Sequence, residues 1–460
     1  MNLPFLDRRE ELRRLRTALG APQGHLVCLY GRRRCGKSRL LQEALGRRPA
    51  VYFVCDERES ALQRDGLASA IAGLIPGFDG VRYPDWEALL ERWVQAAPAG
   101  AVLALDEFPS LVSSASELPS LLQKRIDRPR SEPLHWALCG SSQRMMHGLV
   151  LDASAPLYGR AREILNVRPL PAGWISQALR LRGARGPLEA FSVWGGVPRY
   201  WELAADYRDT WAALRDLVLD PLGPLHGEPV RLLRDEMREI TQVASVMALV
   251  GRGCHRASEL ARRLEKPLTA LSRPLERLVD LGFLKREMPF GVSARDTTRT
   301  LYRIADPFLR FWFRFVEPNR SLLEARRIDV VERQVRAGFP NHEGEIWEDL
   351  ARAGLPYLEI AGRRWGPAAR WWGAGADRRP LEIDIVAESH DGRALLIGEA
   401  KLRVPPRERS KSLAGLRDKV GRFELARGRE VVACLFDATG RAREDSPAVI
   451  NAGQVLAALR

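Results

Sequence analysis

The segment Leu26-Val-Cys-Leu-Tyr-Gly-Arg-Arg-Arg-Cys-Gly-Lys-Ser38 decides the fold expected for this chain. Residues 31–38 fit the pattern G-x-x-x-x-G-K-[ST] at every required position. An apolar run precedes them at 26–30 and a helical pattern follows at 39–45, which is the context that a phosphate-binding loop requires. Glycines let backbone N–H groups curl around a phosphate, and the start of the helix adds partial positive charge. The segment therefore predicts an α/β nucleotide-binding core.

The loop residues have expected roles in binding ATP and Mg²⁺. Lys37 would reach the β- and γ-phosphates during catalysis, and the Ser38 hydroxyl would be a ligand of Mg²⁺. The expected nucleotide-contacting residues of this segment are Gly31, Arg32, Arg33, Arg34, Cys35, Gly36, Lys37, Ser38 and Arg39.

Polar side chains follow two further apolar runs. The run 101–105 ends in Asp106 and Glu107. Asp106 would complete the Mg²⁺ shell, and Glu107 would orient or deprotonate the attacking water. Ser141 follows the run 135–139 and is the candidate for contacting the γ-phosphate, with a plain strand-to-helix turn as the alternative.

An arginine lies in the loop Pro156-Leu-Tyr-Gly-Arg160. Arg160 is a candidate for stabilising charge in the transition state, either in its own chain or from a neighbouring subunit. Plain surface charge is the alternative in so arginine-rich a chain.

The composition narrows the class of protein. The 460 residues include 72 Lys and Arg against 58 Asp and Glu, a formal charge of +14. The length predicts about three domains, and the basic excess favours a polyanionic partner, with a solvated basic surface as the alternative. No apolar run approaches the roughly 18 residues of a membrane span, and acidic residues come too early for a signal peptide. Six cysteines without C-x-x-C spacing exclude a zinc finger and predict reduced thiols in the cytoplasm.

Hydrophobic patterning divides the chain into four segments. Residues 1–225 alternate helical runs with strand-like apolar runs at 25–30, 50–55, 101–105 and 134–139, which predicts a parallel sheet with helices on both faces. Residues 226–317 follow the winged-helix order of helix, turn, helix and two-stranded wing. Residues 318–339 are expected to be a charged helical linker. The last segment, 340–460, predicts a helix at 343–353, three strands at 363–372, 381–389 and 393–401, a second helix at 410–426 and a strand at 430–436.

The last segment carries a second candidate site. Glu399 and Lys401 share one face of a strand because they lie two residues apart. If that strand pairs with the preceding one as a hairpin, Asp384 lies close to Glu399. Two such carboxylates repel one another unless a divalent cation lies between them, and a lysine beside them could stabilise a phosphorane-like transition state. Glu348 is the expected further ligand, so the metal set is Glu348, Asp384 and Glu399, and the catalytic set is Asp384, Glu399 and Lys401.

Five stretches of the chain point to a known family: Phe5-Leu-Asp-Arg-Arg-Glu-Glu-Leu12, Tyr30-Gly-Arg-Arg-Arg-Cys-Gly-Lys-Ser38, Leu138-Cys-Gly-Ser-Ser142, Pro156-Leu-Tyr-Gly-Arg160 and Trp194-Gly-Gly-Val-Pro198. Together they resemble the archaeal-type ATPases, P-loop proteins of the AAA-related STAND group. The resemblance covers essentially the whole chain. It implies a P-loop ATPase core with a small helical lid, a winged-helix domain and a C-terminal α/β domain like the PD-(D/E)xK restriction endonucleases.

Two functions follow as hypotheses. In the first, the chain hydrolyses ATP with Mg²⁺ and acts on DNA, and its nucleotide state controls a nuclease-like domain that takes Mg²⁺ or Mn²⁺. In the second, the chain is a nucleotide-operated switch whose C-terminal domain binds nucleic acid or a partner without cleaving it. A chaperone-like ATPase is a third possibility. The expected partner is DNA, no membrane is involved, and a homo-oligomer stays open, as does cleavage itself.

Overall fold

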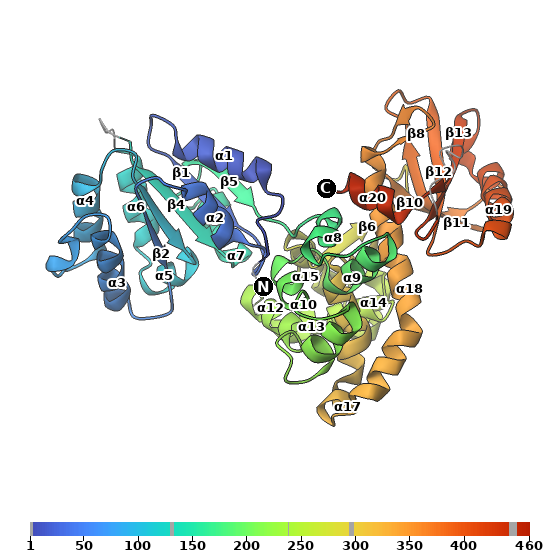
Figure 1. Ribbon diagram of the computed structural model, residues 1–460, viewed down its shortest axis with the longest axis horizontal. Helices are drawn as coiled ribbons and strands as arrows, with labels where there is room; N and C mark the ends of the chain where they lie inside the picture. The colour runs from blue at the N-terminus through green and yellow to red at the C-terminus, as the bar shows by residue number, and fades with distance from the viewer. Residues whose placement is uncertain (1–2, 129–132, 238, 294–298, 441–448) are drawn as a thin grey trace. The chain divides into compact units, whose positions relative to one another are not determined.

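The computed structural model describes residues 3–128, 133–237, 239–293, 299–440 and 449–460. The chain divides into two compact units, residues 7–169 and residues 1–6 with 170–460. We call them the N-terminal unit and the C-terminal unit (Figure 1).

A five-stranded parallel sheet, flanked by helices, forms the centre of the N-terminal unit (Figure 1). Its strands are β1 (Leu26–Tyr30), β2 (Ala50–Val54), β3 (Val102–Asp106), β4 (His135–Gly140) and β5 (Ala161–Asn166), in the order β2-β3-β4-β1-β5. The first four confirm the strands expected from apolar runs. The fifth is mostly half-exposed and carries charged residues, so it lacks the continuous apolar run of a buried parallel strand.

In the described part of the N-terminal unit, α-helices connect these strands or precede them. They are α1 (Arg9–Leu19), α2 (Lys37–Leu45), α3 (Ser60–Ala72), α4 (Trp86–Ala96), α5 (Phe108–Ser114), α6 (Leu118–Ile126) and α7 (Gln143–Met146). Helix α2 begins directly after the phosphate-binding loop, and α5 begins directly after Glu107.

The C-terminal unit begins with helices that were expected to form a lid on the first segment. They are α8 (Ile175–Ala178), α9 (Arg185–Trp194), α10 (Pro198–Ala204) and α11 (Thr210–Leu214). Their aromatic residues pack against later parts of the chain, as where the rings of Tyr200 and Phe308 lie 4.6 Å apart. The chain therefore divides by packing at residue 170, and not at the segment boundary expected at residue 225.

The next elements have the order that predicts a winged helix. Helices α12 (Glu228–Glu236), α13 (Ile240–Gly251), α14 (Ala257–Arg263) and α15 (Thr269–Asp280) are followed by the antiparallel strands β6 (Leu284–Glu287) and β7 (Leu301–Ile304). Helices α16 (Pro307–Phe311) and α17 (Arg320–Glu324) come next.

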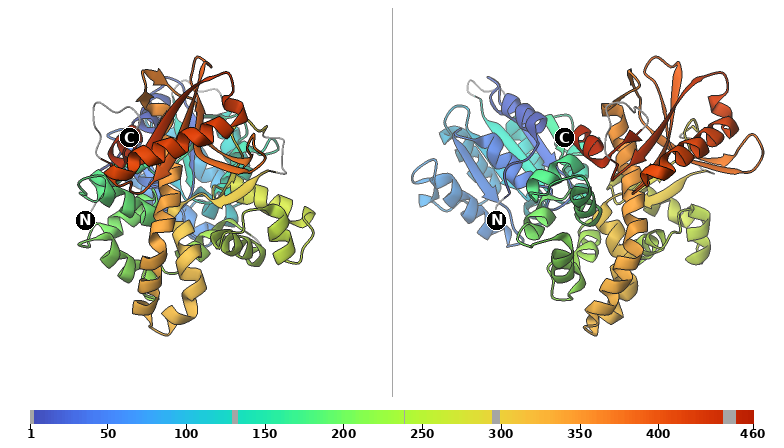
Figure 2. Two further views of the ribbon diagram at one scale, coloured as in Figure 1. Left: turned by 90° about the vertical axis from the view of Figure 1, so that its right-hand side faces the viewer. Right: turned by 45° about the vertical axis from the view of Figure 1, so that its right-hand side comes forward.

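Helix α18 (Ile328–Gly354) is a single helix of 27 residues. Residues 328–339 of the linker expected over 318–339 are thus continuous with the helix expected over 343–353, because Pro340 lies inside α18 without ending it. Its apolar face stays buried along its length, through Val331, Val335, Phe339 and Ile346. Figure 2 shows α18, in orange, from two sides.

A five-stranded mixed sheet follows α18. Its order is β10 (Ala369–Ala374), β11 (Pro380–Glu388), β12 (Ala394–Lys401), β13 (Glu430–Asp437) and β14 (Val449–Ile450), with the short pair β8 (Glu359–Ile360) and β9 (Arg363–Arg364) beside it. Strands β11 and β12 are antiparallel, and β12 and β13 are parallel. Helices α19 (Arg409–Arg422) and α20 (Ala452–Ala458) complete the unit. The strand expected over 363–372 is split, and Pro367 lies in the gap between β9 and β10.

Within the described ranges, no helix has both the length and the apolar character needed to cross a membrane.

Candidate functional site

The phosphate-binding loop has the backbone that its glycines allow. Gly31 has a φ of +140°, and a Cβ atom there would lie 2.4 Å from the carbonyl oxygen of Val167. Gly36, the residue before α2, has a φ of +86°. Both positions therefore need glycine, one for close approach to a neighbouring backbone and one for left-handed geometry.

Lys37 is the first residue of α2, and its side chain reaches back to the loop. Its side chain is 5% exposed, and its ammonium group donates a hydrogen bond to the carbonyl oxygen of Arg32 at 3.1 Å. The acceptor of the buried ammonium is thus a neutral carbonyl oxygen, a contact that a phosphate oxygen could replace. This arrangement fits the expected role of Lys37 at the β- and γ-phosphates.

Asp106 ends β3 beside the loop. Burial alone would raise the pKa of Asp106, but hydrogen bonds from Cys139, Ser38 and Tyr52 hold it below its usual range. The Tyr52 hydroxyl lies 2.5 Å from the carboxylate. The oxygen atoms of Ser38 and Asp106 thus lie together and fit Mg²⁺ in kind, since this ion prefers hard oxygen ligands. Bound there, Mg²⁺ would neutralise charge on the phosphate oxygens.

Glu107 and Ser141 are in direct contact. The Glu107 carboxylate accepts a hydrogen bond from the Ser141 backbone N–H at 3.0 Å and another from the Ser141 hydroxyl at 2.8 Å. Both residues follow the carboxyl ends of neighbouring strands, β3 and β4, so the sheet order brings them together. Glu107 itself has a left-handed backbone, with a φ of +54°.

Arg8 touches the loop and was not expected from the motif alone. Its buried guanidinium donates to the carbonyl oxygen of Cys35 at 3.3 Å and to the carbonyl oxygen of Arg168. The Arg8 side chain therefore ties the phosphate-binding loop to the chain after β5. Asp7 and Arg8 both have a left-handed backbone, a conformation that the sequence alone does not predict for these residues.

The structure places Arg160 away from the phosphate-binding loop of the same chain. Strand β5 runs parallel to β1, with Ala161 beside Leu26 and Asn166 beside Tyr30. Arg160 therefore lies at the amino ends of these parallel strands, and the phosphate-binding loop lies at their carboxyl ends. The two ends are about 16 Å apart for strands of this length. Arg160 instead forms an ion pair with Asp127 at 2.8 Å. Of the two expected roles, action within its own chain does not fit this placement.

The second candidate site also assembles from separate elements. Strands β11 and β12 pair with Ile385 beside Gly398, so Asp384 and Glu399 are the next residues of the two strands. The Asp384 carboxylate accepts a hydrogen bond from the Ala400 N–H at 3.0 Å. The Lys401 ammonium lies 2.9 Å from the Glu399 carboxylate. The hairpin therefore has the geometry on which the sequence prediction depended.

The electrostatics of this site are those of crowded carboxylates. Burial and then the charge of Asp384 raise the pKa of Glu348 to about 7. Burial likewise raises the pKa of Asp384, and the Glu399 charge adds to this effect. Burial would raise the pKa of Glu399 too, but Lys401 and Lys419 hold it below its usual range. Glu348, from α18, thus lies near enough to the Asp384 carboxylate for its charge to act on it.

Two basic residues at this site were not predicted. Lys419, from α19, lies 3.5 Å from the Glu399 carboxylate. Arg352, one helical turn after Glu348, donates to the backbone carbonyl oxygen of Asp384 at 2.8 Å and lies 3.7 Å from the Glu348 carboxylate. No spacing in the sequence relates Lys419 and Arg352 to Glu399 and Lys401, because they belong to other elements that pack against β12.

The carboxylates do not form a closed metal site as they are placed. Across the part of the chain that the structure describes, no three His, Cys, Asp or Glu side chains are grouped so that they could hold a metal ion. The carboxylate oxygens of Glu348, Asp384 and Glu399 are ligands that suit a divalent cation. In this structure, however, Glu399 forms ion pairs with Lys401 and Lys419.

Comparison with known proteins agrees with the N-terminal geometry. Residues 5–180 match the family model of an ATPase domain found predominantly in Archaea, and residues 312–412 match a model of archaeal and bacterial proteins of unknown function. An uncharacterised protein of Methanocaldococcus jannaschii is 26% identical over 405 residues, which are 86% of this chain and 87% of that protein.

A solved structure shares the fold. The Walker-type ATPase of Pyrococcus abyssi aligns with a TM-score of 0.52 and 22% identity, over 67% of this chain and 95% of its own. The chain therefore contains an ATPase-type domain with the P-loop NTPase fold.

Proposed function

We propose that this protein binds and hydrolyses ATP with Mg²⁺, acts on DNA, and uses its nucleotide state to control a metal-dependent nuclease-like site in its C-terminal unit. The observation that carries the proposal is the meeting of Glu348, Asp384, Glu399 and Lys401 at one end of the β11–β12 hairpin. This set comes from two strands and a helix.

The proposed ATP site uses the residues around the phosphate-binding loop. Lys37 and the loop N–H groups bind the phosphates, and Ser38 and Asp106 hold Mg²⁺. Glu107 orients the attacking water and accepts its proton, while Ser141 fixes the carboxylate and faces the γ-phosphate. Arg160 is proposed to act on a neighbouring subunit, because the phosphate-binding loop of the same chain lies at the opposite ends of the strands.

The proposed nuclease-like site uses the carboxylates as cation ligands. Glu348, Asp384 and Glu399 would hold Mg²⁺ or Mn²⁺, which would polarise a phosphodiester and neutralise its charge. Lys401 would then leave Glu399 and place its ammonium beside the phosphate. The raised pKa values of Glu348 and Asp384 support this role, because a bound cation would offset both the burial of these carboxylates and the repulsion between them.

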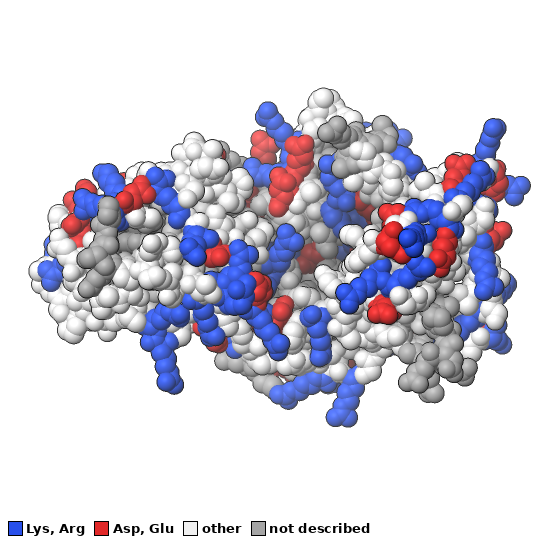
Figure 3. Space-filling model, turned by 90° about the horizontal axis from the view of Figure 1, so that it is seen from above, with Lys and Arg blue, Asp and Glu red and all other residues white. Residues whose placement is uncertain are grey.

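DNA as the partner is supported by charge. The formal charge of the chain is +14, and more Lys and Arg than Asp and Glu side chains are visible on the face in Figure 3. The helices and strands of residues 240–304 have the order of a winged helix and offer a second DNA-binding element. A cytoplasmic location is part of the proposal, since all six cysteines are free and buried.

A specific observation favours the second function, a nucleotide-operated switch that binds without cleaving. Glu399 is paired with both Lys401 and Lys419, so one cation ligand is already neutralised. In this reading the lysines contact a nucleic-acid backbone or an acidic partner, and ATP binding drives partner recognition.

Plasmid cleavage separates the two functions. The full chain is incubated with supercoiled plasmid and Mg²⁺ or Mn²⁺, with and without ATP, beside Asp384→Asn and Lys401→Ala. Exposed residues of α19 provide matched controls, Asp418→Asn and Lys411→Ala. Nicking by wild type and controls, lost in both site variants at an unchanged ATPase rate, supports a nuclease.

Other outcomes decide equally. DNA binding without nicking in any metal supports the switch, and absence of DNA binding at low salt contradicts both DNA-based functions. Lys37→Ala should abolish ATP turnover in every case, so it tests the ATP site alone.

A further inference from the structure

A pocket of ≈ 290 Å³ in the C-terminal unit has a strongly basic lining. Its polar wall is made by Arg252, His255, Arg303, Arg310, Arg314 and Glu345, and two glycines beside Arg252 complete that side. The residues come from the end of α13, from β7 and α16 with the turn after it, and from α18. The pocket belongs to neither site described above.

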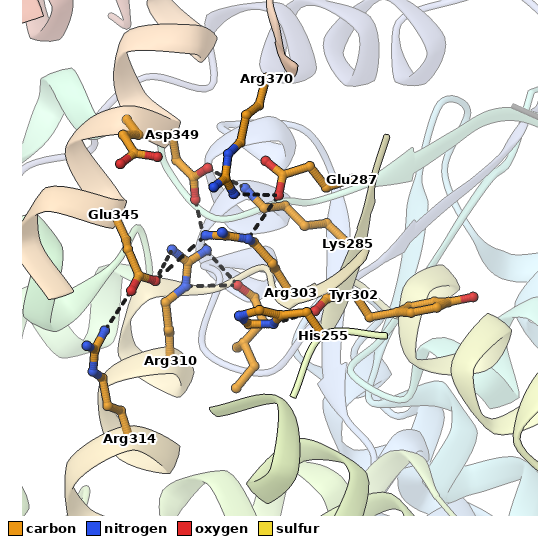
Figure 4. Close-up of polar contacts among 12 residues, drawn as sticks. His255, Lys285, Glu287, Tyr302, Arg303, Arg310, Arg314, Glu345, Asp349 and Arg370 are labelled. Carbon is orange, nitrogen blue, oxygen red and sulfur yellow. Dashed lines mark hydrogen bonds and ion pairs between the residues drawn. The ribbon is translucent and has the colours of Figure 1, made fainter. Parts of the chain in front are cut away.

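The single carboxylate of this wall is shared among three guanidinium groups. Glu345 lies 2.9 Å from Arg314, 3.7 Å from Arg303 and 4.0 Å from Arg310. Figure 4 shows these contacts, with Glu345 on α18 opposite the arginines. One negative charge therefore faces a group of arginines within the pocket.

Arg310 has an unused donor here. It is 5% exposed, and its other nitrogens donate to the carbonyl oxygen of Ile304 and to Asp349 at 2.8 Å. Among the described residues, its Nη1 atom has no hydrogen-bond partner. A buried guanidinium N–H without an acceptor is costly, so an anionic oxygen in the pocket would satisfy it.

The surrounding network does not balance the charge. Among the described residues, the ion pairs behind the pocket join six positive groups to five negative ones. The positive groups are Lys285, Arg303, Arg310, Arg314, Arg352 and Arg370, and the negative groups are Glu287, Glu345, Glu348, Asp349 and Glu382. The pKa of His255 is lowered by burial and then by the Arg303 charge, consistent with a positive surrounding. The positive excess favours an anionic ligand.

We propose that this pocket binds a phosphate group, as a phosphomonoester dianion. Arginine presents a planar fork of donors that matches phosphate oxygens, and three arginines converge here. The volume is at the small end of ligand pockets, which suits a phosphate group better than a whole nucleotide. Such a phosphate can come from a small phosphorylated molecule or from the end of a nucleic-acid strand.

Calorimetry with inorganic phosphate tests the proposal. The full chain carries Lys37→Ala, so that the phosphate-binding loop no longer competes. Phosphate should bind this protein, and adding Arg314→Gln should weaken binding about tenfold, because a charge-assisted hydrogen bond is lost. Adding Glu345→Gln should instead strengthen binding, since it removes the competing carboxylate; a variant that merely damages the fold would not gain affinity.

Arg320→Gln is the matched control, because Arg320 is exposed on α17 and its change removes the same charge. No binding at millimolar phosphate, or equal affinity of the Arg314 and Arg320 variants, would overturn the proposal. Oligonucleotides with a 5′-phosphate or a 5′-hydroxyl identify the source. A preference for the phosphorylated strand that Arg314→Gln removes supports strand ends, and equal binding of both strands, with phosphate still bound, supports a small phosphorylated ligand.

Discussion

Ser141 holds the Glu107 carboxylate with two hydrogen bonds, from its backbone N–H at 3.0 Å and from its hydroxyl at 2.8 Å. A carboxylate fixed this way keeps one oxygen for the hydroxyl and N–H and leaves the other for a water molecule. The two residues expected separately, one as a base and one as a phosphate contact, are thus a single structural unit.

This contact predicts graded losses of ATP turnover. Glu107→Gln should lower kcat by roughly 10²- to 10³-fold while ATP still binds, because the proton acceptor is lost. Ser141→Ala should cost less, about tenfold, because the backbone N–H still holds the carboxylate. Steady-state ATPase assays and binding of a fluorescent ATP analogue measure the two effects, with Ser113→Ala in α5 as control. A Ser141→Ala variant at full activity would contradict the arrangement.

Arg8 should matter for ATP affinity rather than for the chemical step. Arg8→Gln removes the guanidinium that contacts the carbonyl oxygen of Cys35, so the loop loses a fixed point and ATP binding should weaken about tenfold. Arg9→Gln, at the exposed neighbouring position, should bind ATP like wild type. Titration with the ATP analogue measures both, and equal affinities would show that the Arg8 contact is dispensable.

Arg160 should act only where chains meet. Because it precedes β5 and pairs with Asp127, Arg160→Ala should leave the ATPase rate of dilute, separate chains unchanged. Where the rate per chain rises with protein concentration, the variant should lose that rise. The measurement is the specific ATPase activity over a wide range of protein concentrations. An equal loss of activity at every concentration would show that Arg160 acts in the active site of its own chain.

Asp349 should be a large contributor to the stability of the C-terminal unit. Its carboxylate contacts Lys285 at 2.7 Å, Arg310 at 2.8 Å and Arg352 at 2.6 Å, and these charges hold its pKa well below the usual range despite burial. Asp349→Asn should lower the free energy of unfolding by about 3–5 kcal/mol, because three cations lose their counter-ion. Denaturation followed by tryptophan emission measures this. Asp391→Asn, at an exposed ion pair, should change it by less than about 1 kcal/mol.

His342 predicts an acid-sensitive core. Burial lowers the pKa of His342 to about 3, against an ordinary value of 6.5, and its Nε2 atom lies 2.7 Å from the carbonyl oxygen of Ser192. The unfolded chain binds a proton below pH 6.5 and the folded chain does not, so stability falls as pH decreases from 6.5 towards 3.

His342→Gln removes that titration. Between pH 6.5 and about 4.5, the variant should lose on the order of 2 kcal/mol less stability than wild type. Thermal unfolding at a series of pH values measures the difference, with exposed His390→Gln as control. Parallel pH profiles for wild type and His342→Gln would contradict a neutral buried imidazole.

The sequence predicted elements whose patterns are local. Apolar runs gave β1 to β4, and the motif gave the loop, because each depends on residues adjacent in the chain. The approach of Asp384 to Glu399 was also predictable, since a hairpin fixes which residues lie opposite. The hydrogen-bonded pairing of Glu107 with Ser141 was not, because it depends on the order of strands in the sheet.

The features that were not predicted depend on distant parts of the chain. Arg8, Tyr52 and Lys419 reach their sites through packing, and no spacing relates them to the motifs. A segment boundary was expected at residue 340, yet α18 continues through Pro340, because its apolar face is buried on both sides of that residue. The helices after residue 170 were assigned to the first segment because their aromatic partners, such as Phe308, occur much later.

The continuity of α18 limits how this protein can be dissected. A fragment that starts at residue 340 would sever a helix about 40 Å long near its middle, and would discard the half whose buried face includes Val331 and Val335. Shuffling the C-terminal sheet onto another protein would meet the same obstacle. Any cut intended to give a self-sufficient piece therefore has to fall before Ile328.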